Sequence, residues 1–192
     1  MAVLTPAIFC PQPESQTALE QLRAHLGEPE SWGWARPAIW DASERYLGFR
    51  LPTDFKAFLD LYGPGSVDGY LTIDRPMEST PAELERYWGP PPERPAWYGE
   101  IAEDWWEVDE SDVRSGVLLL WGSDEHGSRY FFRAVEDDPA EWRIIISSDE
   151  GEWFETAGTF TEFLVRCFHR TDRPDFMDSS WPRPGARYEA RA

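Results

Sequence analysis

Few residues in this chain could carry out nucleophilic or metal chemistry. The sequence contains three histidines and two cysteines, namely His25, His126, His169, Cys10 and Cys167. Cys167 and His169 are two positions apart on a predicted helix, so their side chains point to different faces and cannot act as a nucleophile and its base. The chain also lacks the Gly-x-Ser-x-Gly elbow, the His-Glu-x-x-His zinc motif and the P-loop. The sequence therefore predicts a protein that is not an enzyme.

One stretch, SDEHGS, gathers Asp124, Glu125 and His126 in a predicted hairpin turn. Carboxylate and imidazole groups bind divalent metal ions, so a metal site is one interpretation of this cluster. A solvated turn between two strands is the commoner reason for such a sequence. We therefore expect neither a stoichiometric metal nor any other cofactor.

The glycines of YGPGS, residues 62–66, raise the possibility of a phosphate-binding loop. Such a loop follows a strand and opens a helix, whose N-terminus faces the anion. Here the order is reversed, because a predicted helix ends at Gly63 and a strand follows Gly65. Gly63 suits a left-handed helix cap, and Pro64 prevents the helix from continuing. We interpret this stretch as a connection between a helix and a strand.

An acidic segment rich in aromatic residues spans residues 93–112, where eight acids and one base surround two tryptophans at 105–106 and a Trp-Tyr pair at 97–98. Aromatic side chains supply buried area in protein interfaces, and the charges around them supply steering and register. An equally good alternative is that the tryptophans face the core and the acids are their solvated flank. The predicted partner-binding residues are Glu100, Glu103, Asp104, Trp105, Trp106, Glu107, Asp109, Glu110 and Asp112, supported by Asp124 and Glu125 at the hairpin tip.

The overall charge favours a basic protein partner. The chain has 36 acidic and 18 basic side chains, a net charge of −18. Residues 1–165 carry a net charge of −20, whereas residues 166–192 carry +2. An acidic body repels nucleic acid and anionic membranes and attracts basic proteins over long range. Solubility alone is the alternative explanation.

The sequence also predicts a cytoplasmic protein. Its longest apolar runs, VLLLW and III, are far shorter than the roughly 20 residues of a membrane-spanning helix. The N-terminus lacks the basic region and apolar stretch of a signal peptide. Two cysteines are too few for a disulfide framework, so we expect both to be reduced and Cys167 to lie in the core.

Hydrophobic periodicity and capping residues predict four helices, then a cluster of strands in the middle of the chain and a fifth, closing helix. The expected helices are residues 13–27, 37–48, 52–63, 80–88 and 158–170, and the expected strands lie within 70–73, 116–134, 142–147 and 152–156. This order predicts a single-domain α+β fold, with a central, mostly antiparallel or mixed β-sheet and flanking helices.

The chain is expected to divide into three parts. Residues 1–36 form an N-terminal helical lead, and residues 37–170 form the α+β domain. Residues 171–192 contain three prolines and no apolar period, so they are predicted to be an extended C-terminal arm whose removal leaves thermal stability nearly unchanged.

Two blocks of sequence carry a family resemblance. The first, WDASERYLGFRLPTDFKAFLDLYGPGS, has an acidic helix with Leu-Gly, then Leu-Pro, then an aromatic-rich helix ended by Tyr-Gly. The second, SGVLLLWGSDEHGSRYFFRAVEDDPAEWRIIISSDEGEWFETAGTFTEFLVRCF, has a strand ending in Trp-Gly, a glycine turn and a closing helix with Phe-Leu. In these features the chain resembles the SUKH superfamily of Smi/Knr-type proteins. It departs from them at Ser128, where the family often has an aspartate.

This resemblance implies an α+β fold and a non-enzymatic role. Bacterial members are typically immunity proteins that bind and neutralise protein toxins, often nucleases, whereas eukaryotic members are interaction and regulatory proteins. A nuclease must be basic to hold phosphates, so an acidic inhibitor fits such a toxin. The expected partner is thus a protein, in particular a basic toxin domain, and neither nucleic acid nor a membrane. A regulatory or scaffold protein with an endogenous partner is the alternative.

Overall fold

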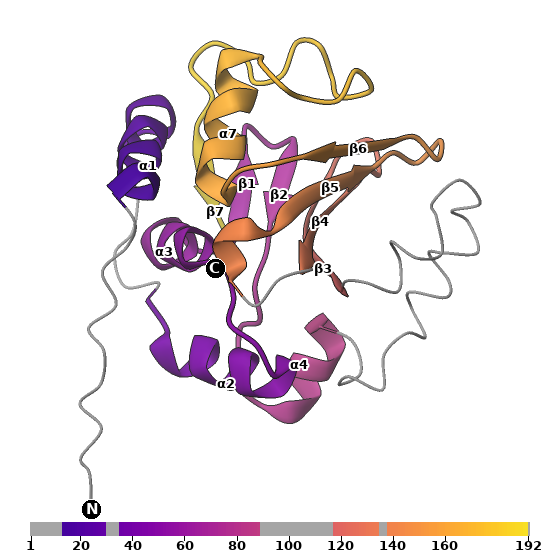
Figure 1. Cartoon of the computed structure of the whole chain (residues 1–192). Coiled ribbons are helices and arrows are strands. Elements are labelled where there is room, and N and C mark those ends of the chain that lie inside the picture. Colours follow the sequence, from indigo (N-terminus) through magenta and orange to yellow (C-terminus); the bar gives the residue numbers. More distant parts are fainter. Residues whose placement is uncertain (1–12, 30–34, 89–116, 135–137, 192) are drawn as a thin grey trace, which may run out of the picture.

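The computed structural model describes residues 13–29, 35–88, 117–134 and 138–191. Within them, helices flank a seven-stranded sheet in which every neighbouring pair of strands is antiparallel, with the strand order β6-β5-β4-β3-β2-β1-β7 (Figure 1). The elements in chain order are α1 (Pro13–Leu26), α2 (Pro37–Leu47), α3 (Thr53–Tyr62), β1 (Gly65–Val67), β2 (Leu71–Ile73), α4 (Pro81–Trp88), β3 (Val117–Asp124), β4 (Arg129–Ala134), a 3₁₀ turn (Pro139–Glu141), β5 (Arg143–Ser147), β6 (Trp153–Thr156), α7 (Phe160–His169) and β7 (Tyr188–Ala190). The predicted single-domain α+β fold is confirmed.

The helices begin and end where their capping residues indicate. The hydroxyl of Thr159 accepts a hydrogen bond from the amide of Glu162, and the Glu162 carboxylate accepts one from the Thr159 amide, so α7 has the predicted capping box. Gly48 adopts the left-handed conformation at the end of α2. Gly63 was expected to do the same after α3, but its φ of 76° and ψ of 177° lie in an extended region open essentially to glycine alone. That conformation turns the chain directly into β1.

A bulge in β3 explains its Trp-Gly pair. The register between β3 and β4 shifts at Leu120–Gly122, which leaves Trp121 as the extra residue and directs its side chain into the core, where it is fully buried. A β-carbon on Gly122 would lie 2.5 Å from the carbonyl oxygen of Thr72, so only glycine lets β2 approach at this point.

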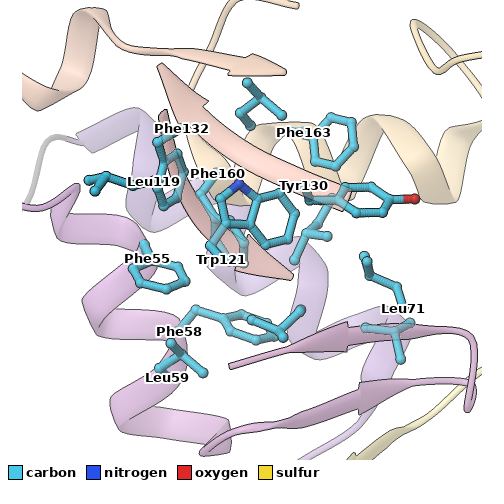
Figure 2. Packing of buried hydrophobic residues seen from close by; sticks show 14 of the residues in the cluster. Phe55, Phe58, Leu59, Leu71, Leu119, Trp121, Tyr130, Phe132, Phe160 and Phe163 are labelled. Atoms are coloured by element: carbon cyan, nitrogen blue, oxygen red, sulfur yellow. The ribbon is translucent and has the colours of Figure 1, made fainter. Parts of the chain in front are cut away.

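The main core lies between the sheet and the helices α1, α3 and α7, which cover one face, while α2 and α4 pack at one end of it (Figure 1). Figure 2 shows the Trp121 indole enclosed by rings from β4, α3 and α7. Its nearest aromatic contact is edge-to-face with Phe160, at a centroid distance of 5.0 Å. Leu22 and Leu26 of α1 belong to the same core, so this helix of the predicted N-terminal lead is packed onto the domain.

The opposite face of the sheet carries a second, smaller apolar cluster. It consists of Leu118, Phe131 and Ile145, with Leu120 and Trp153 packed beside them. Ile144 and Ile146 of β5 point into the main core instead. The continuously apolar β5 therefore contributes to both faces, as its sequence predicts.

The C-terminal residues correct the prediction of an extended arm. β7 pairs with β1, with Tyr188 opposite Val67 and Ala190 opposite Gly65. The two backbones lie so close that a β-carbon on Gly65 would sit 2.2 Å from the carbonyl oxygen of Glu189. Residues 171–191 thus complete the sheet at the edge that β1 would otherwise leave unpaired.

The reason for this error lies in how the C-terminal segment is held. Trp181 and Met177 are each only 2% exposed, although neither belongs to a helix or strand. The Trp181 indole stacks on Tyr70 at 5.0 Å, and its N–H donates to the carbonyl oxygen of Val67 at 3.3 Å. Single buried residues such as these produce no periodic pattern, so the sequence showed only the three prolines, which are typical of an extended arm.

No helix among the described residues is long and apolar enough to cross a membrane.

Candidate functional site

The central part of the predicted binding segment lies outside the described residues. This applies to Glu100, Glu103, Asp104, Trp105, Trp106, Glu107, Asp109, Glu110 and Asp112. Their role in partner binding stays a prediction. The structure does describe Asp124 and Glu125, and it places both at the β3–β4 turn.

The β3–β4 turn sits among three other segments at one end of the domain. The amide of Glu125 donates to the carbonyl oxygen of Tyr70, which ties this turn to the β1–β2 turn. A β-carbon on Gly127, whose φ is +88°, would lie 3.5 Å from the β-carbon of Asp149, so the β5–β6 turn is adjacent on the other side. The amide of Asp178, from the C-terminal segment, donates to the Tyr70 hydroxyl. We call this end of the molecule, opposite α2 and α4 in Figure 1, the turn end.

Asp124 organises the turn end from beneath. Asp124 is only 8% exposed, and its carboxylate accepts hydrogen bonds from the hydroxyls of Tyr130 (2.9 Å) and Tyr70 (3.1 Å). It also accepts from the amides of His126 and Ser128, both at 3.0 Å. Burial raises the pKa of both tyrosines, so they remain protonated donors at neutral pH. Because these four bonds occupy the carboxylate, Asp124 fixes the turn in place rather than presenting its charge to a partner.

Glu125 and His126, in contrast, are exposed beside one another. The Nε2 of His126 lies 3.7 Å from Oε1 of Glu125, and the His126 ring contacts Tyr70 at a centroid distance of 5.5 Å. Together with Asp149 and Glu150 of the neighbouring turn, Glu125 makes the exposed surface of these two turns predominantly acidic. A surface of this kind attracts positively charged groups over long range.

The C-terminal segment adds residues that sequence reasoning missed. Asp178 lies beside the β3–β4 turn, and its carboxylate accepts hydrogen bonds from the amide and the hydroxyl of Ser180. Those bonds hold the pKa of Asp178 below its usual value. Arg183 pairs with Asp68 in the β1–β2 turn at 2.8 Å. Residues 171–192 were predicted to lie outside the domain, so Asp178 and Arg183 were not among the predicted site residues. No periodic pattern in this segment indicates that it packs on the domain.

The other candidate reactive groups are poorly placed for catalysis. Cys167 is fully buried, and burial raises the pKa of its thiol to about 12, so it is neither accessible nor ionised at neutral pH. His25 stacks on Phe168 at 4.7 Å and meets His169 edge-on at 5.5 Å. Burial lowers the pKa of His25, with a smaller contribution from His169. These histidines join α1 to α7 and lie apart from the Cys167 thiol, which faces the core.

Comparison with known proteins identifies the family. No curated protein and no solved structure gave a significant match to the chain. The model of the SMI1 / KNR4 family (SUKH-1) matches residues 35–166, about two thirds of the sequence. The match begins just before α2 and ends within α7, so it includes six of the seven described strands and leaves out β7. The chain therefore belongs to the SMI1 / KNR4 family (SUKH-1).

Proposed function

We propose that this protein is a non-enzymatic immunity protein, which binds a basic protein toxin in the cytoplasm and neutralises it. The observation that carries the proposal is the net charge of −18 on a member of a family that includes immunity proteins. A toxin that degrades nucleic acid needs a basic surface, and an acidic protein can cover that surface in place of the phosphates.

Two surfaces would contribute to such a complex. The first is the predicted segment 100–112, where Trp105 and Trp106 would be buried anchors and the surrounding acids would steer the approach. The second is the exposed acidic part of the turn end, at Glu125 and its neighbouring turn. The rigid network around Asp124 supports the second surface, because a preorganised contact loses less conformational entropy on binding.

A kinetic experiment tests the steering charges. Glu103, Asp104 and Glu107 are changed together to lysine, and association with a basic toxin domain found in the gene neighbourhood is followed by surface plasmon resonance. We expect association to slow at least tenfold at low salt while dissociation changes little. The difference should shrink at physiological salt, where the Debye length is about 8 Å.

A matched control separates a local effect from a change in total charge. Reversing Asp41, Glu78 and Glu85 alters the net charge by the same amount at exposed positions on or near α2 and α4, outside segment 100–112 (Figure 1). This control should slow association much less. Equal slowing by both variants would mean that only the net charge matters, and no slowing by either would contradict the proposed role of the segment.

The aromatic residues call for a different readout. Replacing Trp105 or Trp106 with alanine should speed dissociation by an amount equivalent to about 2 kcal/mol if the ring is an anchor. Each variant must first be shown to keep the unfolding midpoint of the parent, since truncating a tryptophan that faces the core would lower the free energy of unfolding by a similar amount.

The alternative role is a regulator or scaffold with an endogenous partner. Gene neighbourhood separates the two roles. A gene for a large secreted toxin beside this one supports the immunity function, whereas its consistent absence across related genomes supports the regulator.

A further inference from the structure

Three potential metal ligands from distant parts of the chain meet at the turn end. Glu125 and His126 come from the β3–β4 turn, and Asp178 comes from the C-terminal segment about fifty residues later. One ligand atom from each side chain lies within 4.8 Å of the other two. The sequence offered only adjacent residues in a single turn, and the docking of the C-terminal segment adds the third group.

The type and spacing of these groups suit a divalent transition metal. One imidazole nitrogen and two carboxylate oxygens form a donor set that zinc accepts, with water in a fourth position. Bonds of about 2.0–2.2 Å in a tetrahedral arrangement place the ligand atoms about 3.3–3.6 Å apart. The Nε2 atom of His126 and the Oε1 atom of Glu125 are already 3.7 Å apart. Because the side chains of Glu125 and His126 are both exposed, they can rotate to bring the three ligand atoms to bonding distance from one ion.

The backbone that carries these ligands is fixed by the buried network beneath it. The amide of His126 is bound to Asp124, and the amide of Glu125 is bound to the carbonyl oxygen of Tyr70. The Tyr70 hydroxyl accepts from the amide of Asp178 at 3.3 Å, so one tyrosine touches both ligand-bearing segments. Such supporting hydrogen bonds orient metal ligands and raise affinity.

The charges around the cluster also allow a cation to bind. The Asp178 carboxylate accepts from Ser180 at 2.8 and 2.9 Å, which leaves lone pairs on both oxygens free to coordinate. The nearest guanidinium groups are already engaged, since Arg183 is paired with Asp68 and Arg173 donates to backbone carbonyl oxygens, including that of Trp181.

We propose that Glu125, His126 and Asp178 form a zinc-class metal site that joins the β3–β4 turn to the C-terminal segment. A bound ion would hold the two segments together at the turn end, because its ligands come from both. The site lies in part beyond the region that the family model matches, since Asp178 follows residue 166.

Titration of the full chain with zinc chloride tests the site directly. Cys10 is replaced by serine throughout, because a free thiol is itself a strong zinc ligand. Isothermal titration calorimetry at pH 7.5 is expected to give one equivalent with a micromolar dissociation constant. His126→Ala and Asp178→Asn should each weaken binding at least tenfold, and circular dichroism should show that both variants stay folded.

Matched variants distinguish this site from other histidines and carboxylates. His25→Ala and His169→Ala should bind zinc as the parent does, although their rings also lie close together. Asp175→Asn, an exposed carboxylate three residues before Asp178, should likewise have no effect.

Thermal unfolding gives an independent readout. At a hundredfold excess over the parent's dissociation constant, zinc should raise the midpoint of the parent by roughly 5–10 °C and that of His126→Ala by at most about half as much. The proposal is overturned if no saturable binding occurs up to millimolar zinc. It is equally overturned if binding survives both His126→Ala and Asp178→Asn, or if it is lost in His25→Ala instead.

Discussion

Replacing Trp181 with alanine tests how the C-terminal segment is attached to the domain. The indole is 2% exposed, stacks on Tyr70 and donates a hydrogen bond to the backbone of Val67 in β1. Its removal would leave a cavity beside the edge of the sheet and remove one of the two hydrogen bonds that the Val67 carbonyl oxygen accepts, the other coming from the Tyr70 amide. If residues 171–191 were a free arm, the same change would have almost no effect.

The expected loss follows from these contacts. Truncating a buried tryptophan to alanine costs about 3–5 kcal/mol in free energy of unfolding. For a protein of this size each kcal/mol lowers the melting temperature by about 2–4 °C, so the midpoint should fall by about 6–20 °C. Trp181→Phe keeps most of the ring contact but loses the N–H donor, which costs about 1 kcal/mol, plus a smaller amount for the reduced area.

Urea unfolding followed by far-ultraviolet circular dichroism measures these differences without relying on the many other tryptophans. Met77→Ala is the control, because Met77 is 46% exposed and its truncation should change stability by no more than about 0.5 kcal/mol. A loss below about 1 kcal/mol for Trp181→Ala would contradict the packing described for the C-terminal segment. A chain ending at residue 170 should be less stable than Trp181→Ala, since it also loses β7.

Three further predictions concern buried groups. Asp124→Ala should cost about 3–5 kcal/mol in urea unfolding, because it leaves the buried hydroxyls of Tyr70 and Tyr130 without their acceptor; a loss below 1 kcal/mol would contradict that role. Burial raises the pKa of the Asp54 carboxyl group in α3, so the folded state binds its proton more tightly than the unfolded state does. The stabilisation from this protonated group is complete below about pH 4 and is lost as the pH rises through the folded-state pKa. The unfolding free energy of wild type relative to Asp54→Asn should therefore decrease between pH 5 and 7.5 in urea titrations, and an increase would refute the direction. In a protein with the other cysteine changed to serine, Cys167 should not react with a thiol reagent at pH 8 until the chain is unfolded, and prompt reaction would refute its burial.

Much of the fold could be predicted from the sequence because local signals agree with the tertiary structure. The periodic apolar residues of α7 face the core, and its cap residues form the predicted bonds. The alternating and continuous apolar runs gave the strands from Val117 to Thr156 with nearly correct limits. In these elements the apolar positions of the sequence pattern are the positions that are buried in the fold, so the pattern was enough to predict them.

The C-terminal segment could not be predicted in this way. Trp181 and Tyr188 are buried and bonded to residues more than a hundred positions earlier, namely Val67 and Gly63. Single anchors separated by prolines have no period, and a three-residue strand such as β7 is too short for a pattern. Its strand conformation is defined by its pairing with β1, which the sequence does not show.

The candidate site was predictable in part. The sequence placed Asp124, Glu125 and His126 together in a turn, which the structure confirms. It could not separate their roles, because burial distinguishes the organising carboxylate of Asp124 from the exposed Glu125. Asp178 was missed for the same reason as the rest of the C-terminal segment.

The central claim, that this family member neutralises a basic toxin, is tested most directly by mixing the purified protein with a basic toxin domain found in its gene neighbourhood. Calorimetry should give a one-to-one complex with a nanomolar dissociation constant, and the same protein added to an activity assay should inhibit the toxin stoichiometrically. No detectable binding at about 10 µM of each protein, which is roughly ten-thousandfold above a dissociation constant of 1 nM, together with an undiminished toxin activity, would contradict the claim.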